Sequence, residues 1–209
     1  MITIATVLKC GGEYTAYHVD VMKRAIDKHG TSECKFVCLT DFYSGNFEKI
    51  RLENNWPKWW SKMELFKIKG PVLYFDLDTI IVGSLIPLIE IAKSNQFSIL
   101  RDVYQGTAKP NAMQSSIMAW NDDMSYLYNR FKNDDKQIIK LLHGDQAFIT
   151  RNVHPKTVTF FQDIIPDTLL SFKADVQGKS IFTKTSAVFF HGFPRPWQQT
   201  QIAYDNTKK

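Results

Sequence analysis

The sequence of 209 residues lacks most features of membrane-spanning, secreted and disulfide-bonded proteins. It has three cysteines, Cys10, Cys34 and Cys38, and this odd, sparse set without metal-ligand spacing argues against a disulfide framework and against a zinc site. No apolar run approaches the ~20 residues of a membrane span, and no charged-then-apolar leader stands at the start. We therefore expect a soluble, cytoplasmic protein with reduced cysteines and no membrane span.

Nucleotide-binding glycine motifs are also missing. Gly11-Gly12 follows the first predicted strand, but neither a Gly-x-Gly-x-x-Gly nor a Walker pattern surrounds it. We interpret the pair as a tight turn. The sequence has no internal repeats and no low-complexity tract.

The overall composition is that of a globular protein with a sizeable core. Hydrophobic residues make up 44% and charged residues 22% of the chain, which fits one domain over 1–209 with 206–209 as a frayed tail. The formal charge of +5 favours polyanionic partners, such as nucleotide phosphates, nucleic acid or an anionic membrane surface.

The hydrophobic pattern alternates between strand and helix signals, which indicates an α/β fold. The expected strands are 2–8, 35–39, 72–75, 97–100, 115–120 and 187–190, with short strands within 158–165. The expected helices are 13–29, 61–68, 85–93, 124–131, 136–142 and 145–151. Ser61, Asp122 and Asp145 are the predicted N-caps of three of these helices. Residues 104–111 and 172–185 read as loops.

The most informative stretch is 71–82, where Asp76 and Asp78 follow a short apolar strand. Open α/β sheets bind their ligands at the carboxyl ends of such strands. Two carboxylates held together repel each other, and a divalent metal with oxygen ligands relieves this repulsion. A phosphatase of the haloacid dehalogenase type also places Asp-x-Asp after an apolar strand, although normally after the first one. The motif alone leaves both interpretations open.

Three indoles gather in five positions, at Trp56, Trp59 and Trp60. Indoles beside a cleft can stack on sugars or bases, but such clusters more often belong to a core or a packed lid. We interpret this one as packing.

An ordered set of motifs carries a family resemblance: Tyr-Phe-Asp-Leu-Asp at 74–78, Gly-Asp-Gln at 144–146 and His-Gly-x-x-Arg-Pro-Trp at 191–197. The chain resembles the glycogenin-like retaining glycosyltransferases of family eight. That resemblance implies a single GT-A-type (Rossmann-like) nucleotide-sugar-binding domain, with a mixed, mostly parallel central sheet flanked by helices. It also implies a divalent ion, Mn²⁺ or Mg²⁺.

The resemblance also assigns roles to residues. The metal ligands would be Asp76, Asp78 and His191. The donor-binding residues would be Lys62, Asp76, Asp102, Gln114, Ser115, Gly192 and Trp197. The catalytic residues would be Asp145, Gln146 and Arg195. The chain departs from the family pattern at Gln114, Ser116 and Arg195, so the donor sugar stays open.

The sequence therefore predicts a metal-dependent glycosyltransferase that moves a hexose or pentose from a nucleotide diphosphate sugar, a UDP-sugar, to an acceptor hydroxyl with retention. The acceptor is unknown, and the positive charge leaves modified nucleic acid open. The alternatives are the dehalogenase-type phosphatase and a non-catalytic module that binds sugar nucleotides or nucleic acid.

Overall fold

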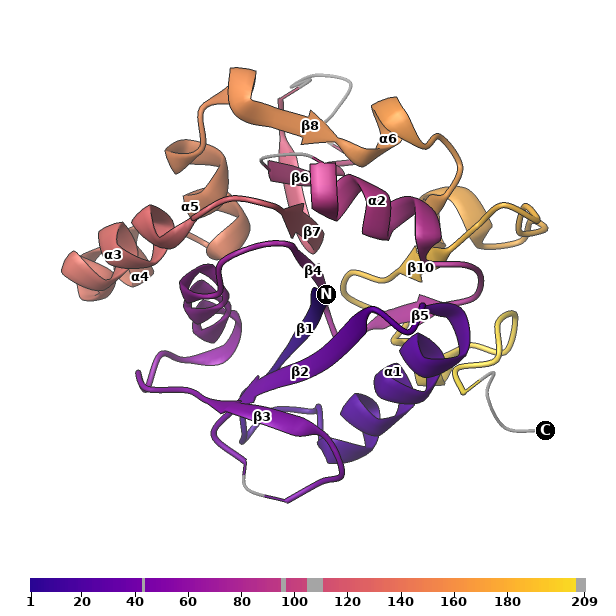
Figure 1. Cartoon of the computed structure of the whole chain (residues 1–209), viewed down its shortest axis with the longest axis horizontal. Helices are drawn as coiled ribbons and strands as arrows, with labels where there is room; N and C mark the ends of the chain where they lie inside the picture. The colour runs from indigo at the N-terminus through magenta and orange to yellow at the C-terminus, as the bar shows by residue number, and fades with distance from the viewer. Residues whose placement is uncertain (43, 95–96, 105–110, 206–209) are drawn as a thin grey trace.

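The computed structural model describes residues 1–42, 44–94, 97–104 and 111–205. Within these residues a seven-stranded sheet has the strand order β3-β2-β1-β4-β7-β6-β8 (Figure 1). The strands are β1 (Ile2–Leu8), β2 (Cys34–Thr40), β3 (Glu48–Arg51), β4 (Val72–Phe75), β6 (Phe97–Arg101), β7 (Met113–Trp120) and β8 (Val158–Phe160). Neighbouring strands are parallel except at β7, which is antiparallel to both β4 and β6. The mixed, mostly parallel α/β fold is confirmed.

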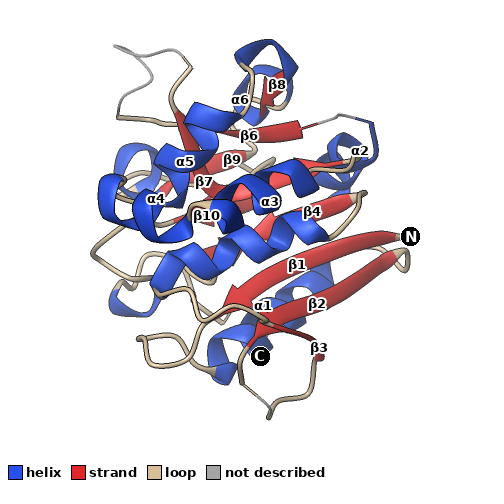
Figure 2. Ribbon diagram, turned by 90° about the vertical axis from the view of Figure 1, so that its left-hand side faces the viewer, coloured by secondary structure: helices blue, strands red, loops and turns tan. Residues whose placement is uncertain are grey.

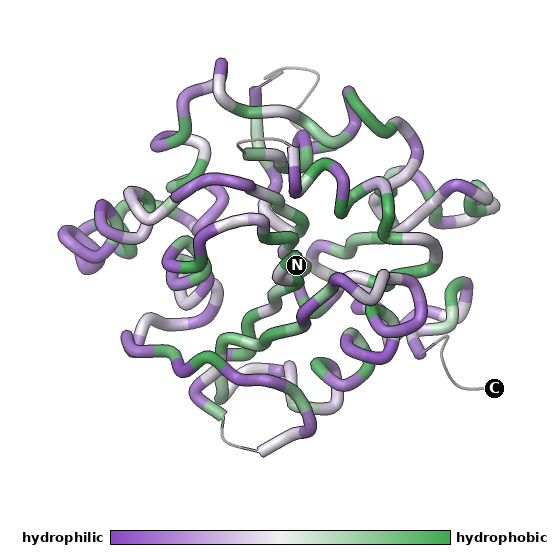
Figure 3. Tube along the Cα trace, in the orientation of Figure 1, coloured by the Kyte–Doolittle hydropathy of each residue, from purple (hydrophilic) through white to green (hydrophobic). Residues whose placement is uncertain are grey.

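Helices cover both faces of this sheet. The helix α1 (Ala16–His29) and the helix α2 (Ile86–Ser94) pack on one face. The other face carries η1 (Lys58–Lys67), which is a 3₁₀ helix, α3 (Ser125–Asn133) and α5 (Asp145–Asn152). Figure 2 faces this second side, with α3, α4 (Asp135–Leu141) and α5 in front of the strands. In Figure 3 the outermost helices α3 and α4 are largely hydrophilic, because their polar faces point to solvent.

A second, three-stranded sheet lies beside α1. It has the order β5-β10-β9 and consists of β5 (Thr79–Ile81), β9 (Leu169–Ser171) and β10 (Ala187–Phe189). The backbone N–H of Phe190 donates to the carbonyl of Asp78 at 3.2 Å. This sheet therefore brings the C-terminal segment next to the Asp-x-Asp motif.

The remaining elements are short. They are η2 (Pro155–Thr157), α6 (Phe161–Ile164), the π-helix η3 (Phe172–Val176) and η4 (Pro196–Gln198). Among the described residues no helix has the length and apolar character needed to cross a bilayer. The three cysteines are free, with Cys10 exposed and Cys38 buried.

Most predicted elements are present, and several details of the prediction are wrong. Residues 161–164, expected as strand, form the helix α6, and the strands β3, β5 and β9 were not predicted. The helix α1 begins at Ala16 rather than at residue 13, because Glu13 and Tyr14 stay in the loop that follows β1. The residues 105–110 of the expected loop, and the tail 206–209, lie outside the described residues.

The three predicted N-caps are also wrong. Pro57 precedes η1, and Ser61 lies inside it and donates to the Lys58 carbonyl at 2.8 Å. Met124 precedes α3, while Asp122 accepts a hydrogen bond from the backbone of its own neighbour, Asp123.

At α5 the capping position belongs to Gly144. Asp145 is the first helical residue, and its carboxylate is drawn to Lys62 and Ser115 on other elements. Its side chain therefore serves long-range contacts rather than the helix end.

Candidate active site

A pocket of about 580 Å³ opens at the carboxyl ends of β1 and β4. Its walls come from the loop after β1, the start of η1, the Asp-x-Asp motif, β7, the start of α5 and one residue of the C-terminal segment. The lining residues with polar or aromatic side chains are Lys9, Cys10, Glu13, Tyr14, Lys58, Trp59, Ser61, Lys62, Tyr74, Asp76, Asp78, Gln114, Ser115, Ser116, Asp145, Gln146 and Arg195. Six segments of the chain thus contribute polar side chains to the pocket, at the edge where α/β sheets bind ligands.

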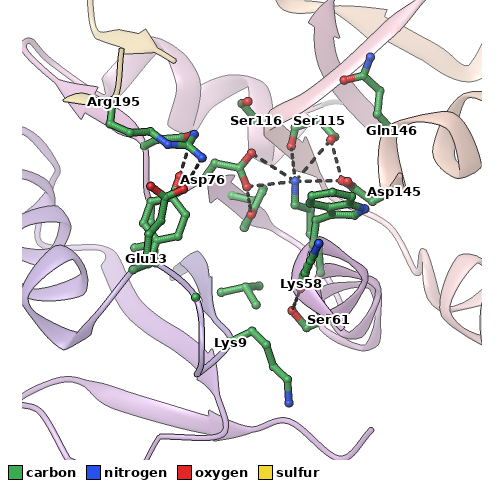
Figure 4. Close-up of a pocket in the computed structure, with 18 of the residues that line it drawn as sticks. Lys9, Glu13, Lys58, Ser61, Asp76, Ser115, Ser116, Asp145, Gln146 and Arg195 are labelled. Atoms are coloured by element: carbon green, nitrogen blue, oxygen red, sulfur yellow. Dashed lines mark hydrogen bonds and ion pairs between the residues drawn. The ribbon is translucent and has the colours of Figure 1, made fainter. Parts of the chain in front are cut away.

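Lys62 is the centre of one charge cluster, whose carboxylates, Asp76 and Asp145, are labelled in Figure 4. Its ammonium lies 3.0 Å from Asp76 Oδ1 and 2.9 Å from Asp145 Oδ2. The side chain is only 7% exposed. Burial alone would lower the pKa of Lys62, but Asp145 and Asp76 outweigh it and raise the pKa above its usual value. The ammonium is therefore charged at neutral pH.

The two carboxylates of this cluster have further donors. The Tyr74 hydroxyl donates to Asp76 Oδ1, and the Ser115 hydroxyl donates to Asp145 Oδ2 at 2.7 Å. Burial raises the pKa of Asp76, Lys62 opposes that rise, and Asp145 adds to it. The cluster is a closed network in which each carboxylate accepts from a hydroxyl and from Lys62.

Asp78 belongs to a second cluster at the mouth of the pocket. Its Oδ2 accepts a hydrogen bond from the Tyr14 hydroxyl at 2.9 Å and from Arg195 Nη1 at 3.1 Å. Arg195 also forms an ion pair with Glu13 (Figure 4). Burial and the neighbouring charge of Asp76 raise the pKa of Asp78 to about 7. The two carboxylates of the motif therefore repel each other, as the sequence predicts.

Polar groups on β7 and α5 form the floor of the pocket. Gln114 Oε1 accepts the Ser116 N–H at 3.0 Å, so two of the three positions that depart from the family pattern contact each other. Gln146 Nε2 donates to Asp102 Oδ2 at 3.1 Å. Asp102 is buried and does not itself line the pocket.

His191 lies next to the motif in the backbone but turns its side chain elsewhere. It follows Phe190, which is hydrogen-bonded to Asp78. Its Nε2 lies 3.3 Å from the Ser171 hydroxyl. Its ring packs edge-to-face with the ring of Tyr104, and the two ring centroids are 4.9 Å apart. Burial lowers the pKa of His191, and Lys173 lowers it further.

Among the described residues no three His, Cys, Asp or Glu side chains form a group that could hold a metal ion. The three predicted ligands nevertheless suit a divalent ion in type, since they offer two carboxylates and an imidazole. The ligand assignment of Asp76, Asp78 and His191 remains a prediction.

Two more predicted residues lie away from the pocket walls. Gly192 has φ +67°, a left-handed conformation that glycine adopts without strain, and it lets the chain turn after His191. Trp197 packs against His18 at 4.5 Å and against Tyr14 and Tyr204. The structure thus gives Trp197 a packing role that anchors the segment carrying Arg195.

Several residues that line the pocket were not predicted as site residues from the sequence. Glu13 and Tyr14 stand directly after β1, where the carboxyl-end rule could have found them. Tyr74 belongs to the predicted strand, but nothing in the sequence shows that its hydroxyl reaches Asp76. Trp59 was interpreted as packing together with its neighbours, and it lines the pocket instead.

Comparison with known proteins defines the fold. No protein-family model matches the sequence, and no curated protein sequence matches it. Among solved structures, the glycosyltransferase GlyE of Streptococcus pneumoniae TIGR4 superposes with a TM-score of 0.72 at 12% identity, over 97% of this chain and 58% of GlyE. The galactosyltransferase LgtC, in complex with donor and acceptor sugar analogues, superposes with a TM-score of 0.64 at 14% identity, over 94% of this chain and 89% of LgtC.

This chain has a glycosyltransferase fold of the GT-A type. Mouse xyloside xylosyltransferase 1 shares it with a TM-score of 0.54 at 10% identity, over 92% of this chain and 98% of that enzyme. The chain spans little more than half the length of GlyE. At these identities the likeness describes the fold alone.

Proposed function

We propose that this chain is a metal-dependent glycosyltransferase that moves a sugar from a nucleotide diphosphate donor, a UDP-sugar, to an acceptor hydroxyl with retention. The observation that carries the proposal is the pocket itself. A glycosyltransferase fold presents two adjacent carboxylates, Asp76 and Asp78, each paired with a cation, at the ligand-binding edge of its sheet. Retention and the UDP-sugar rest on the family resemblance.

In this proposal Arg195 binds the diphosphate. Negative charge grows on the diphosphate as the glycosidic bond breaks, so a cation held there stabilises the transition state more than the ground state. The guanidinium now contacts Asp78 and Glu13, and its fork suits bidentate contact with phosphate oxygens. A divalent ion held by Asp76, Asp78 and His191 would supply further Lewis-acid stabilisation of the leaving group.

Asp145 and Gln146 are proposed to face the sugar. They stand at the start of α5, across the pocket from Glu13 (Figure 4). The carboxylate of Asp145 would stabilise the positive charge that develops on the anomeric carbon, and Gln146 would hydrogen-bond sugar hydroxyls. Lys62, which is ion-paired with both Asp76 and Asp145, fixes the distance between the diphosphate end and the sugar end.

The test is a thermal-unfolding screen with UDP and Mn²⁺. At a ligand concentration 100-fold above the dissociation constant, linkage stabilises the folded state by about 2.7 kcal/mol. For a chain of this size the melting temperature then rises by roughly 5–10 °C. No shift with any nucleoside diphosphate, with or without Mn²⁺ or Mg²⁺, contradicts the proposal.

Substitutions separate the site from general effects. Asp78→Asn should remove Mn²⁺-dependent hydrolysis of the donor while the protein stays folded, and His191→Ala should do the same if its imidazole is a ligand. Asp123→Asn is the matched control, since Asp123 lies outside the pocket, where it pairs with Lys69. Full activity of His191→Ala across metal concentrations would remove this residue from the ligand set.

The dehalogenase-type phosphatase has less support. Its motif normally follows the first strand, whereas Asp76 and Asp78 follow β4. The carboxylate that would act as nucleophile, Asp76, is ion-paired with Lys62 and hydrogen-bonded by Tyr74. Hydrolysis of a phosphate monoester without any response to nucleoside diphosphates would restore this alternative.

A further inference from the structure

The three clustered indoles have two different environments. Trp56 and Trp60 are 4% exposed, whereas Trp59 is 48% exposed and lines the pocket. Trp60 stacks on Phe131 with ring centroids 5.0 Å apart, and Trp56 meets the edge of the same ring at 4.7 Å. Trp56 Nε1 also donates to Asp135 at 2.7 Å. The core therefore accounts for two indoles, whereas the third has the Lys58 ammonium 5.5 Å from its ring centroid and is otherwise half exposed at the pocket wall.

The chain around Trp59 is shaped to keep its ring at the pocket wall. Lys58, the preceding residue, has φ +52°, a left-handed conformation that is uncommon for a residue with a side chain. Gly144 lies next to the indole, because a Cβ atom added to this glycine would be only 3.2 Å from Trp59 Nε1. The backbone of Gly144 is extended, so its conformation does not require glycine. The missing side chain is therefore what makes room for the indole.

The position of this indole along the pocket is the informative point. Gly144 directly precedes Asp145 and Gln146, so Trp59 lies at their end of the cavity. Figure 4 shows Lys58 on the same side as Asp145, whereas Glu13 and Arg195 lie on the other side of Asp76. The indole therefore lies at the proposed sugar end of the pocket, opposite Arg195, which is the proposed diphosphate ligand.

We propose that Trp59 is the platform for the acceptor, and that the acceptor presents a sugar ring to it. The inference rests on the proposed function. One face of a pyranose or furanose ring carries C–H groups that pack on an aromatic face, while its hydroxyls require polar partners. The pocket offers both beside each other, with the indole of Trp59 next to Asp145 and Gln146. The platform is open to solvent, so an acceptor can reach it while the donor fills the interior.

The test measures transfer from the donor to a panel of methyl β-glucoside, methyl β-galactoside, methyl β-xyloside and lactose. Trp59→Ala should raise the KM for the accepted glycoside about tenfold, the loss expected for one aromatic contact. The KM for the donor should change much less. Trp59→Tyr should recover most of the acceptor affinity, because it restores an aromatic face.

Two further variants test whether a rise in the acceptor KM comes from lost contact with the indole or from a general loss of structure. Gly144→Ala retains the indole but pushes a methyl group against it, so the acceptor KM should rise in the same direction. Tyr126→Ala removes an aromatic side chain of similar exposure, 45%, that is not part of the pocket wall, and it should behave as the wild type. Melting temperatures of all variants, measured in parallel, identify any loss of folding.

The possible outcomes distinguish a failure of this inference from a failure of the proposed glycosyltransferase function. If the wild type neither binds nor turns over any nucleotide sugar, the proposed function fails and the inference falls with it. If donor turnover is present but the acceptor KM is unchanged in Trp59→Ala, the inference alone is wrong. It is also wrong if the donor KM rises as much as the acceptor KM, or if hydroxymethylated DNA is glycosylated while no sugar of the panel binds or reacts.

Discussion

Asp76 and Asp78 stand two residues apart in one motif, yet the protein holds them in two different ways. Each carboxylate is bound by one tyrosine hydroxyl and one cation. These partners are Tyr74 and Lys62 for Asp76, and Tyr14 and Arg195 for Asp78. The two carboxylates have partners of the same chemical types. The two regions differ in how deeply the cation is buried and in which segments of the chain supply the partners.

The two partners of Asp76 belong to the core, although the Asp76 side chain itself is 25% exposed to the pocket. Lys62 is 7% exposed, lies in η1 between the sheet and α3, and is shared with Asp145. The Asp78 region is assembled at the pocket mouth, where Arg195 is 17% exposed and its second partner, Glu13, is 40% exposed. A buried, shared cation is fixed on folding, whereas a cation at the mouth can exchange its carboxylates for a ligand. We infer that the Asp76 region is preformed and that the Asp78 region responds to the donor.

The largest expected effect comes from removing the cation of the core region. Lys62→Met keeps the length of the side chain but leaves the buried carboxylate of Asp145 and the partly buried carboxylate of Asp76 without a counter-charge. Breaking a buried ion pair on one side costs roughly 3–5 kcal/mol of unfolding free energy. Urea denaturation of the ligand-free protein measures the difference.

The matched control is Lys69→Met, which removes a 76% exposed lysine from its pair with Asp123. Exposed pairs contribute about 0–1 kcal/mol, so this variant should unfold near the wild type. If Lys62→Met were as stable as Lys69→Met, the inference that the Asp76 region is preformed would be wrong.

The second expected effect compares the two tyrosines. Tyr74→Phe removes a buried hydroxyl that donates to Asp76, and hydrogen bonds to charged groups contribute about 1.5–3 kcal/mol. Tyr14→Phe removes the corresponding donor to Asp78, and Tyr14 is itself only partly buried, unlike Tyr74. Denaturant unfolding should therefore show a larger loss for Tyr74→Phe. Equal losses would mean that the two hydroxyls are equally desolvated.

The sequence predicts the preformed region better than the responsive one. An apolar strand followed by Asp-x-Asp is a local pattern, and Lys62 stands close to it in the chain, so both were identified. Glu13 and Arg195 are 182 positions apart, and no local pattern joins them. The direction of the His191 ring likewise depends on Ser171 and Tyr104, which come from other segments.

The fold shows the same division between local and long-range information. The longer strands were predicted, whereas β3, β5 and β9 are short and are defined by their partners in the sheets. Residues 61–68 were expected to form a helix, and the structure has the 3₁₀ helix η1 over Lys58–Lys67. Every residue from Trp60 to Phe66 is buried, because η1 packs against both the sheet and α3. These contacts come from segments that are distant in the chain, so the local pattern does not show them.

The third expected effect concerns the cation of the responsive region. Arg195→Met should cost about 1 kcal/mol of unfolding free energy, because its pair with Asp78 is only partly buried and Tyr14 remains as a donor. Its effect on UDP affinity should be larger than its effect on stability, since the diphosphate would lose a bidentate partner. Calorimetric titration of UDP measures the affinity. A variant that unfolds as easily as Lys62→Met, with unchanged UDP affinity, would make Arg195 a structural residue.

The smallest expected effect is at the outer end of the same region, where Glu13 holds Arg195. Glu13→Gln keeps a hydrogen-bond acceptor and removes only the charge, so the variant should lose roughly 0–1 kcal/mol of unfolding free energy at low salt. Salt at about 1 M shortens the screening length to ~3 Å, so the difference from wild type should then vanish. Lys62→Met should keep its deficit at the same salt, because Lys62 and its partner Asp145 are both buried. A Glu13→Gln deficit that persisted in 1 M salt would place this pair in the interior with the Asp76 region and remove the distinction between the two halves of the motif.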